Sequence, residues 1–200
     1  KKLGMLPKKP KKATYKPKPY EQMTYPGERI QVDVKVVPEG IADPEMKLYQ
    51  YTAIDEYTRK DFYTDMRSKA PIFSRLCKKA GEMVQTQRNN GEMYSDDNGF
   101  EFTNRFSPSK RDKKTLFENT LSQLGIEHKL IRPYTPRHNG KVERSHREDH
   151  NKFYSCHRFY SCDDLNVQLA ARLSRTNNRP MRPLKWFSPI EFLNNSVQYD

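Results

Sequence analysis

Three acidic residues have positions from which a folded chain can bring carboxylates together: Asp33, Asp97 and Glu143. Asp33 lies inside an alternating, strand-like segment, Asp97 just past a second short strand, and Glu143 in the first turn of a long helix. Ends of neighbouring strands and a helix N-terminus can meet at one point. Three carboxylates there would repel one another unless cations lay between them, and Mg²⁺ is bound by such oxygen ligands. The sequence therefore predicts a divalent-metal site.

Each acid also has a plainer interpretation when it is taken alone. Asp33 could be an edge-strand acid that faces water. Asp97-Asn98-Gly99 has the composition of a simple turn. The segment 133–144 could be a Pro- and Gly-rich loop that leads into a basic, solvated helix. The three segments together are much more specific than any one of them.

In order and spacing, these segments resemble the retroviral-integrase-like DDE transposases of bacterial insertion sequences. The resemblance covers residues 25–197, nearly everything after the N-terminal segment. It rests on five groups of residues: Arg29-Ile30-Gln31-Val32-Asp33, 53–59 (AIDEYTR), 97–102 (DNGFEF), 134–144 (YTPRHNGKVER), and Asn178-Arg179-Pro180 with 188–193 (SPIEFL).

This resemblance implies a ribonuclease-H-like fold and a catalytic, metal-binding triad of Asp33, Asp97 and Glu143. It implies two ions, Mg²⁺ or Mn²⁺, that support cleavage and strand transfer on double-stranded DNA at element ends and targets. Two ions roughly 3.5–4 Å apart can activate a nucleophile and stabilise the leaving 3′ oxygen. Water serves as nucleophile in hydrolysis and a DNA 3′-OH in strand transfer, with the protein acting as a homo-oligomer on DNA.

Basic residues surround the third acid. On a helix that starts near Gly140, several of them lie within one or two turns of Glu143, where they would bind phosphates beside the metals. A solvated helix face is the alternative. The predicted DNA contacts are Arg137, Lys141, Arg144 and Arg147.

The chain departs from the family pattern in two places. Forty-five residues separate Asp97 from Glu143, more than is usual, and the excess falls in a basic, Pro-containing loop at residues 105–114. The segment Val84-Gln85-Thr86 resembles the residues that precede the second aspartate in this family, but Gln87 follows it where an acid would be expected. Asp97 keeps the expected Asn-Gly-x-Glu-Phe sequel, and Asp96 is the alternative second acid.

Other functions are also open. A tetrahedral zinc site could be drawn from His146, His150, Cys156, His157 and Cys162, although no Cys-x₂-Cys pair is present. A metal-dependent nuclease without joining activity, or an inactive DNA-binding remnant, would carry the same fold. Cys77 is predicted to be a buried thiol, and Asp55 a turn residue without a role in metal binding.

The elements that must position the acids are read from periodicity. Strands are predicted at 29–37, 47–54, 61–67, 92–95 and 126–131, and helices at 72–85, 115–124, 140–154 and 163–174, the last of the chain. Three hairpin-type strands followed by alternating helices and strands indicate an α/β fold, a mixed five-stranded sheet flanked by helices.

Composition sets the outer limits. The 200 residues carry a net charge of +12, and 12% are aromatic, too many for a disordered polyelectrolyte. Residues 1–24 are predicted to be a basic, flexible arm and residues 25–200 a catalytic core; positions 1–20 alone hold eight lysines, four prolines and no acid. The excess positive charge indicates a polyanionic partner and not a membrane. Three cysteines and the lack of a signal segment predict a cytoplasmic protein, associated with the nucleoid when it is bound to DNA.

Overall fold

The structure is a computed structural model. It describes residues 21–39, 47–63, 79, 92–95, 99, 101–105, 107–131 and 139–197. The predicted helix at 72–85 and the second half of the strand predicted at 61–67 lie outside this part, apart from Lys79, which is helical.

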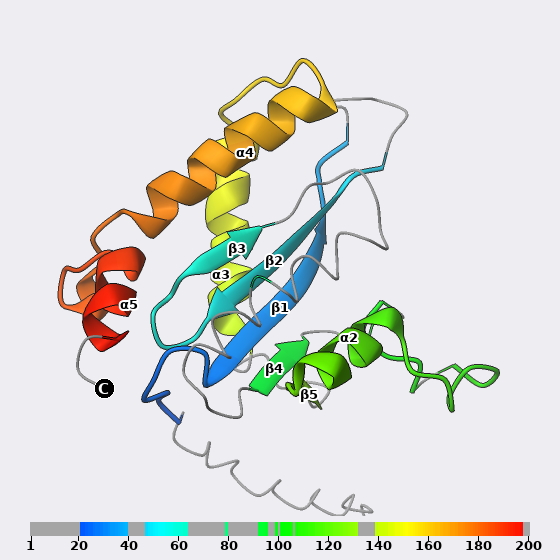
Figure 1. Ribbon diagram of the computed structural model, residues 1–200. Helices are drawn as coiled ribbons and strands as arrows, with labels where there is room; N and C mark the ends of the chain where they lie inside the picture. The colour runs from blue at the N-terminus through cyan, green and yellow to red at the C-terminus, as the bar shows by residue number, and fades with distance from the viewer. Residues whose placement is uncertain are drawn as a thin grey trace, which may run out of the picture.

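A mixed sheet forms the centre of the molecule (Figure 1). Its order is β3-β2-β1-β4-β5; β1 pairs with β2 and β2 with β3 in antiparallel fashion, whereas β4 lies parallel to both β1 and β5. The strands are β1 (Arg29–Val36), β2 (Tyr49–Asp55), β3 (Asp61–Tyr63), β4 (Glu92–Ser95) and β5 (Glu127–Leu130).

The alternation of β1 separates an apolar face of the sheet from a polar one. Ile30 and Val32 are buried in a core that includes Phe117 and Leu121 of α2 (Leu116–Leu124). Side chains of opposite parity point to the other face. There the buried Gln31 accepts hydrogen bonds from the first backbone N–H groups of α3. The polar face of β1 is therefore covered by a helix.

Three helices and two short helical turns follow β5 within residues 139–197. They are α3 (Gly140–Asp149), the π-helical turn η2 (His150–Tyr154), α4 (Cys162–Asn177), the 3₁₀ turn η3 (Arg182–Leu184) and α5 (Pro189–Val197). Figure 1 shows α4 running across the end of α3, with α5 beyond it at the C-terminal end. A second apolar cluster, with Phe153, Phe159, Leu165 and Leu169 at its centre, joins η2 to α4.

Two helix predictions need correction. The predicted helix at 140–154 is α-helical only to Asp149 and then widens into η2. The helix at 163–174 is not the last one, because α5 follows it. The start of α5 has a capping box, in which Ser188 and Glu191 bond each other's backbone N–H groups, and this pattern is readable in the sequence.

The described part of the chain contains no helix that combines the length and the apolar character needed to span a membrane.

Candidate active site

Asp33 and α3 meet through a histidine. Nδ1 of His146 lies 3.0 Å from Oδ2 of Asp33, and Nε2 of the same ring lies 2.9 Å from Oγ1 of Thr52. Thr52 is the cross-strand partner of Asp33 in the β1–β2 register. Oδ1 of Asp33 accepts the backbone N–H of Val34 at 2.7 Å. The buried imidazole thus joins two neighbouring strands and holds one oxygen of the Asp33 carboxylate, while the Val34 N–H holds the other.

Glu143 stands one helical turn before His146. Residues three apart share a helix face, so Glu143 and His146 lie on the same side of α3. The helix start is held against the sheet because Gln31 Oε1 accepts the N–H groups of Lys141 (3.1 Å) and Val142 (3.2 Å). Glu143 itself is exposed in the first turn, where the helix dipole favours a negative charge. Asp33 and Glu143 are therefore directed to the same region by two successive anchors.

The second acid follows the adjacent strand. In the parallel β1–β4 pair, Val32 is opposite Ser95, the last residue of β4. The chain leaves β4 beside the residue that precedes Asp33. Asp96 and Asp97 come next and lie outside the described residues, so the choice between them stays a prediction.

Two family models match this chain and overlap: one, described as integrase core domain, covers residues 24–136, and another with the same description covers residues 124–189. The first alone spans more than half of the sequence. The chain belongs to the integrase core domain family. A search of curated proteins finds no significant match.

Solved integrase structures share the fold of this integrase core. The catalytic core domain of BIV integrase is 17% identical and superposes with a TM-score of 0.53, over 87% of this chain and 99% of that one. The HTLV-2 integrase catalytic core domain in complex with magnesium (trimeric form) is 15% identical with a TM-score of 0.52, over 84% and 97%. At such low identity the likeness establishes the integrase catalytic core fold, which is ribonuclease-H-like.

The carboxylate set has the chemistry of a Mg²⁺ or Mn²⁺ site. Asp33 is held rigidly by its strand, and the side chain of Glu143 has no hydrogen-bond or ion-pair partner among the described residues. Within this part of the chain no three His, Cys, Asp or Glu side chains gather closely enough to hold a metal. A three-carboxylate site that includes Asp33 and Glu143 would need an acid from outside the described residues, and Asp97, with Asp96 as the alternative, stays the prediction.

The four basic residues predicted to contact DNA separate in space. Arg147 and Arg144 are exposed, and Arg144 Nε lies 3.6 Å from Glu148. Lys141 points inward, with Nζ 3.0 Å from Glu56 Oε2 and 2.8 Å from the Glu56 carbonyl. A phosphate contact by Lys141 would have to open this ion pair. Arg137 lies outside the described residues.

A buried polar network lies behind the acid site. Asp149 accepts hydrogen bonds from Gln50 Nε2 (2.9 Å), Tyr63 Oη (2.8 Å) and Arg172 Nε (3.3 Å). The pKa of Tyr63 is raised well above its ordinary value by burial and by the charges of Asp61 and Asp149. Sequence reasoning missed this network; its only signal is a polar residue at alternate positions of β2.

Three residues of the alternative zinc site, His146, Cys156 and His157, are engaged elsewhere. Nδ1 of His157 lies 3.0 Å from the Phe153 carbonyl, and the exposed Cys156 donates to the Asn151 carbonyl through Sγ. His146 binds Asp33 and Thr52, as described above.

Asp55 closes a turn, as predicted. Its Oδ1 accepts from the N–H of Gly27 (2.9 Å), and its Oδ2 accepts from the N–H and the hydroxyl of Thr58 (both 2.7 Å). Cys77 lies outside the described residues.

The inserted loop after the second acid is, in the described residues, a series of exposed turns. Asn104 Nδ2 donates to the Lys113 carbonyl at 2.8 Å and so closes the loop at its base. Thr115 then starts α2. The insertion is therefore accommodated at the surface.

Proposed function

We propose that this integrase core is the catalytic part of a DNA transposase of the bacterial insertion-sequence type, which cuts DNA at element ends and joins it to a target. The observation that supports this best is the Asp33–His146–Thr52 contact, with Glu143 one turn away on the same helix face. This contact supports a site in which Asp33 and Glu143 approach each other from β1 and α3, with the third acid expected just after the neighbouring strand β4.

In this proposal Asp33, Asp97 and Glu143 hold two Mg²⁺ or Mn²⁺ ions. When bound, the ions would activate the attacking oxygen and stabilise the leaving 3′ oxygen of an in-line displacement. Asp33 is held firmly because it lies mid-strand and its carboxylate is bonded by His146 and by the backbone. Glu143 approaches from the helix.

The remaining parts of the proposal concern partners. Double-stranded DNA is the substrate; Arg137, Arg144 and Arg147 contact its phosphates, and Lys141 can do so once released from Glu56. The arm at residues 1–24 adds charge, and the active form is a homo-oligomer on DNA. We place the protein in the cytoplasm, on the nucleoid when it is bound.

The test is a metal-dependent cleavage and joining assay on labelled duplex DNA with the variants Asp33→Asn, Asp97→Asn and Glu143→Gln. Each substitution keeps the side-chain shape and removes a charge. We expect each to lower the rate at least about 100-fold, as loss of several kcal/mol of transition-state stabilisation implies. Manganese calorimetry on the DNA complex should lose at least one strong site with Glu143→Gln.

Two controls decide between the alternatives. Asp96→Asn should cut normally; if it is inactive while Asp97→Asn is active, the second acid is Asp96. Products that are cut but never joined would identify a nuclease, and no metal-dependent activity in the unmodified protein would identify a binding remnant.

A further inference from the structure

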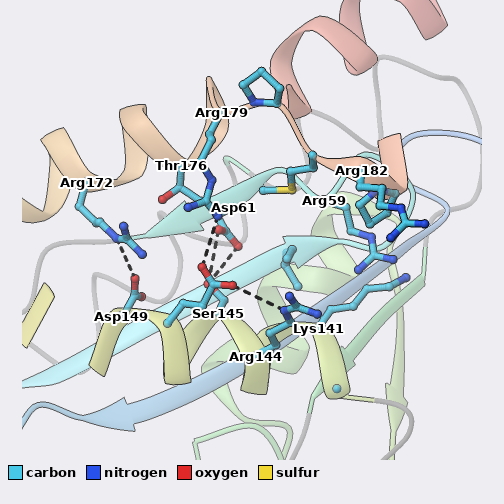
Figure 2. Close-up of a pocket in the computed structure, with 16 residues that line it drawn as sticks. Arg59, Asp61, Lys141, Arg144, Ser145, Asp149, Arg172, Thr176, Arg179 and Arg182 are labelled. Atoms are coloured by element: carbon cyan, nitrogen blue, oxygen red, sulfur yellow. Dashed lines mark hydrogen bonds and ion pairs between the residues drawn. The ribbon is translucent and has the colours of Figure 1, made fainter. Parts of the chain in front are cut away.

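A basic cleft lies on the far side of α3 from Glu143. It has a volume of about 490 Å³ and is bounded by α3, by the end of α4 with the segment 179–183 that follows it, and by the β2–β3 connection. Its lining contains three acids, Asp61, Glu148 and Asp149, and six basic residues: Arg59, Lys141, Arg144, Arg172, Arg179 and Arg182. Figure 2 shows Arg59 and Arg182 near Lys141 at one end, and Asp149 with Arg172 at the other.

The acids of the cleft are already committed to protein partners. Asp149 pairs with Arg172 in the interior. Glu148 is shared among Arg144 (3.6 Å), Lys152 (3.2 Å) and Arg179 (3.3 Å). One carboxylate cannot neutralise three cations, so the open end keeps an excess of positive charge.

Arg182 adds to this excess. Its side chain makes no hydrogen bond or ion pair with any described residue, and the residue is exposed at the start of η3. Figure 2 shows Arg59 at the same end of the cleft as Arg182. Two guanidinium groups on separate segments can grip phosphate oxygens in the way that arginine favours.

One strained backbone position lines this cleft, and two more lie in the turn that follows its lining residues Arg182 and Pro183. Among the described residues, the non-glycine positions with positive φ are Arg59 (62°), Lys185 (53°) and Trp186 (69°). Arg59 lines the cleft, and the other two follow Arg182 and Pro183 in the same turn. Side chains with a Cβ disfavour this conformation, and such residues cluster at binding sites.

The strained turn exposes the single tryptophan of the chain. The backbone N–H of Trp186 donates to the carbonyl of Met181, which lines the cleft, and the buried Leu184 anchors the turn. The side chain of Trp186 is nevertheless 69% exposed, and that of Phe187 is 42% exposed. Trp186 is not among the residues that line the cleft, but it follows Arg182 by four positions in the same turn, and exposed aromatic rings near basic residues are typical of surfaces on which nucleic-acid bases stack.

This surface is distinct from the acid site. With 3.6 residues per turn, Lys141, Arg144, Ser145 and Glu148 follow one side of α3, whereas Glu143 is about 200° around the helix from Lys141. The helix therefore separates the two sites.

We propose that the cleft is a second nucleic-acid site, in which Arg59 and Arg182 bind backbone phosphates and Trp186 stacks on an adjacent base. The site would hold DNA that extends beyond the segment at the carboxylates. The inference rests on the proposed function only for the identity of the polyanion, and it needs no metal.

The fluorescence of Trp186 tests this directly, because the chain has one tryptophan. The full 200-residue chain in EDTA is titrated with a 12-nucleotide oligothymidylate, a 12-base-pair duplex and a polyglutamate peptide. We expect quenching by DNA, stronger with the single strand because its bases are free to stack. Equal quenching by polyglutamate, or none by either DNA, would overturn the assignment.

Charge variants locate the contact. Arg59→Gln with Arg182→Gln should weaken DNA binding and lower the slope of log affinity against log salt by about two, one for each phosphate contact. Arg158→Gln is the matched control, since it removes an exposed arginine near the opposite end of α4. Each single substitution in the cleft should therefore lower the slope by about one. Arg158→Gln should leave the quenching amplitude unchanged. An effect of Arg158→Gln equal to that of the cleft variants would overturn the proposal.

Aromatic variants, measured by the anisotropy of a labelled oligonucleotide, complete the test. Trp186→Ala should weaken single-strand binding about fivefold or more, and Trp186→Phe should restore part of it because a π face remains. Unchanged single-strand binding by Trp186→Ala would show that Trp186 does not stack on a base. Asp33→Asn should bind at the cleft normally, so a failed cleavage assay and a failed cleft are distinguishable.

Discussion

At the scale of single residues, the carboxylate of Asp33 is held in place by hydrogen bonds from its neighbours. An imidazole that bonds both a carboxylate and a cross-strand hydroxyl has few orientations open to it. Side chains that orient a metal ligand in this way contribute to metal affinity without touching the metal. His146 is accordingly a positioning residue in the proposed site.

We expect His146→Ala to lower Mn²⁺ affinity and cleavage about 10- to 100-fold, the range typical of outer-shell contacts. His146→Asn should retain more of both, because its amide can donate a hydrogen bond to Asp33. Manganese calorimetry, with thermal unfolding to verify the fold, measures the effect. If His146→Ala bound Mn²⁺ as well as the wild type, the contact between His146 and Asp33 would contribute to packing alone.

Asp61 makes the stability of the fold depend on pH. Burial, and next the negative charge of Asp149, raise the pKa of Asp61 from 3.8 to about 8. The folded state therefore keeps a proton that the unfolded chain releases between about pH 4 and 8. Over this window the contribution of Asp61 to the free energy of unfolding falls as pH rises.

Asp61→Asn removes this ionisation. At pH 9 the variant should melt at least about 2–4 °C above the wild type, the shift that corresponds to 1 kcal/mol, and near pH 4 the difference should shrink. Differential scanning calorimetry at the two pH values checks it. The exposed Asp112→Asn should show no such pattern; equal pH profiles for both variants would contradict the argument.

At the scale of elements, α2 is tied to the segment that follows the second acid. Thr115 caps the helix: its Oγ1 accepts the N–H of Glu118 at 3.1 Å and donates to the Phe102 carbonyl at 3.0 Å, while Glu118 bonds back to the Thr115 N–H. One side chain thus joins the helix start to the backbone of Phe102. Gly125, with φ 69°, ends the helix in a left-handed cap.

Thr115→Ala should lower the free energy of unfolding by about 1–2 kcal/mol, since it removes a helix cap and leaves the Phe102 carbonyl without this donor. Thr115→Ser keeps the hydroxyl and should recover most of the loss. Chemical denaturation of both variants gives the comparison. An equal loss in Ser and Ala would assign the effect to the methyl group.

At the scale of the whole molecule, positive charge occurs in three places: the predicted arm, the helix that carries Glu143, and the cleft behind it. Residues 1–20 of the arm carry eight of the twelve net charges. Phosphate contacts release counterions, so each region should contribute to the salt dependence of DNA binding.

Deletion of residues 1–20 should weaken DNA binding and make its salt dependence shallower, by up to about seven in the log–log slope if all eight lysines contact phosphates. Cleavage by the fully bound complex should not change, because the arm carries none of the proposed metal ligands. Filter binding over a salt series measures the slope. An unchanged slope would make the arm a linker.

Local pattern determined much of this protein. The alternation at Arg29–Val36 placed β1 and gave Asp33 a different face from Val32, and the Thr115 and Gly125 signals placed α2. The motif segments identified the integrase core fold and the three candidate acids. These features are readable because strand period, helix caps and turns depend on residues close together in the chain.

Tertiary packing decided the rest. Asp33 and His146 are 113 positions apart, and Lys141 and Glu56 are 85 apart, so neither contact has a local signature. The hydrogen bonds that Gln31 accepts from the first turn of α3 determine which side of the helix faces Asp33 and which faces Arg182. Both sides of α3 carry polar and charged residues, so the sequence does not show which side packs against which part of the sheet. Only the folded chain separates the side of α3 with Glu143 from the side with the arginine cleft.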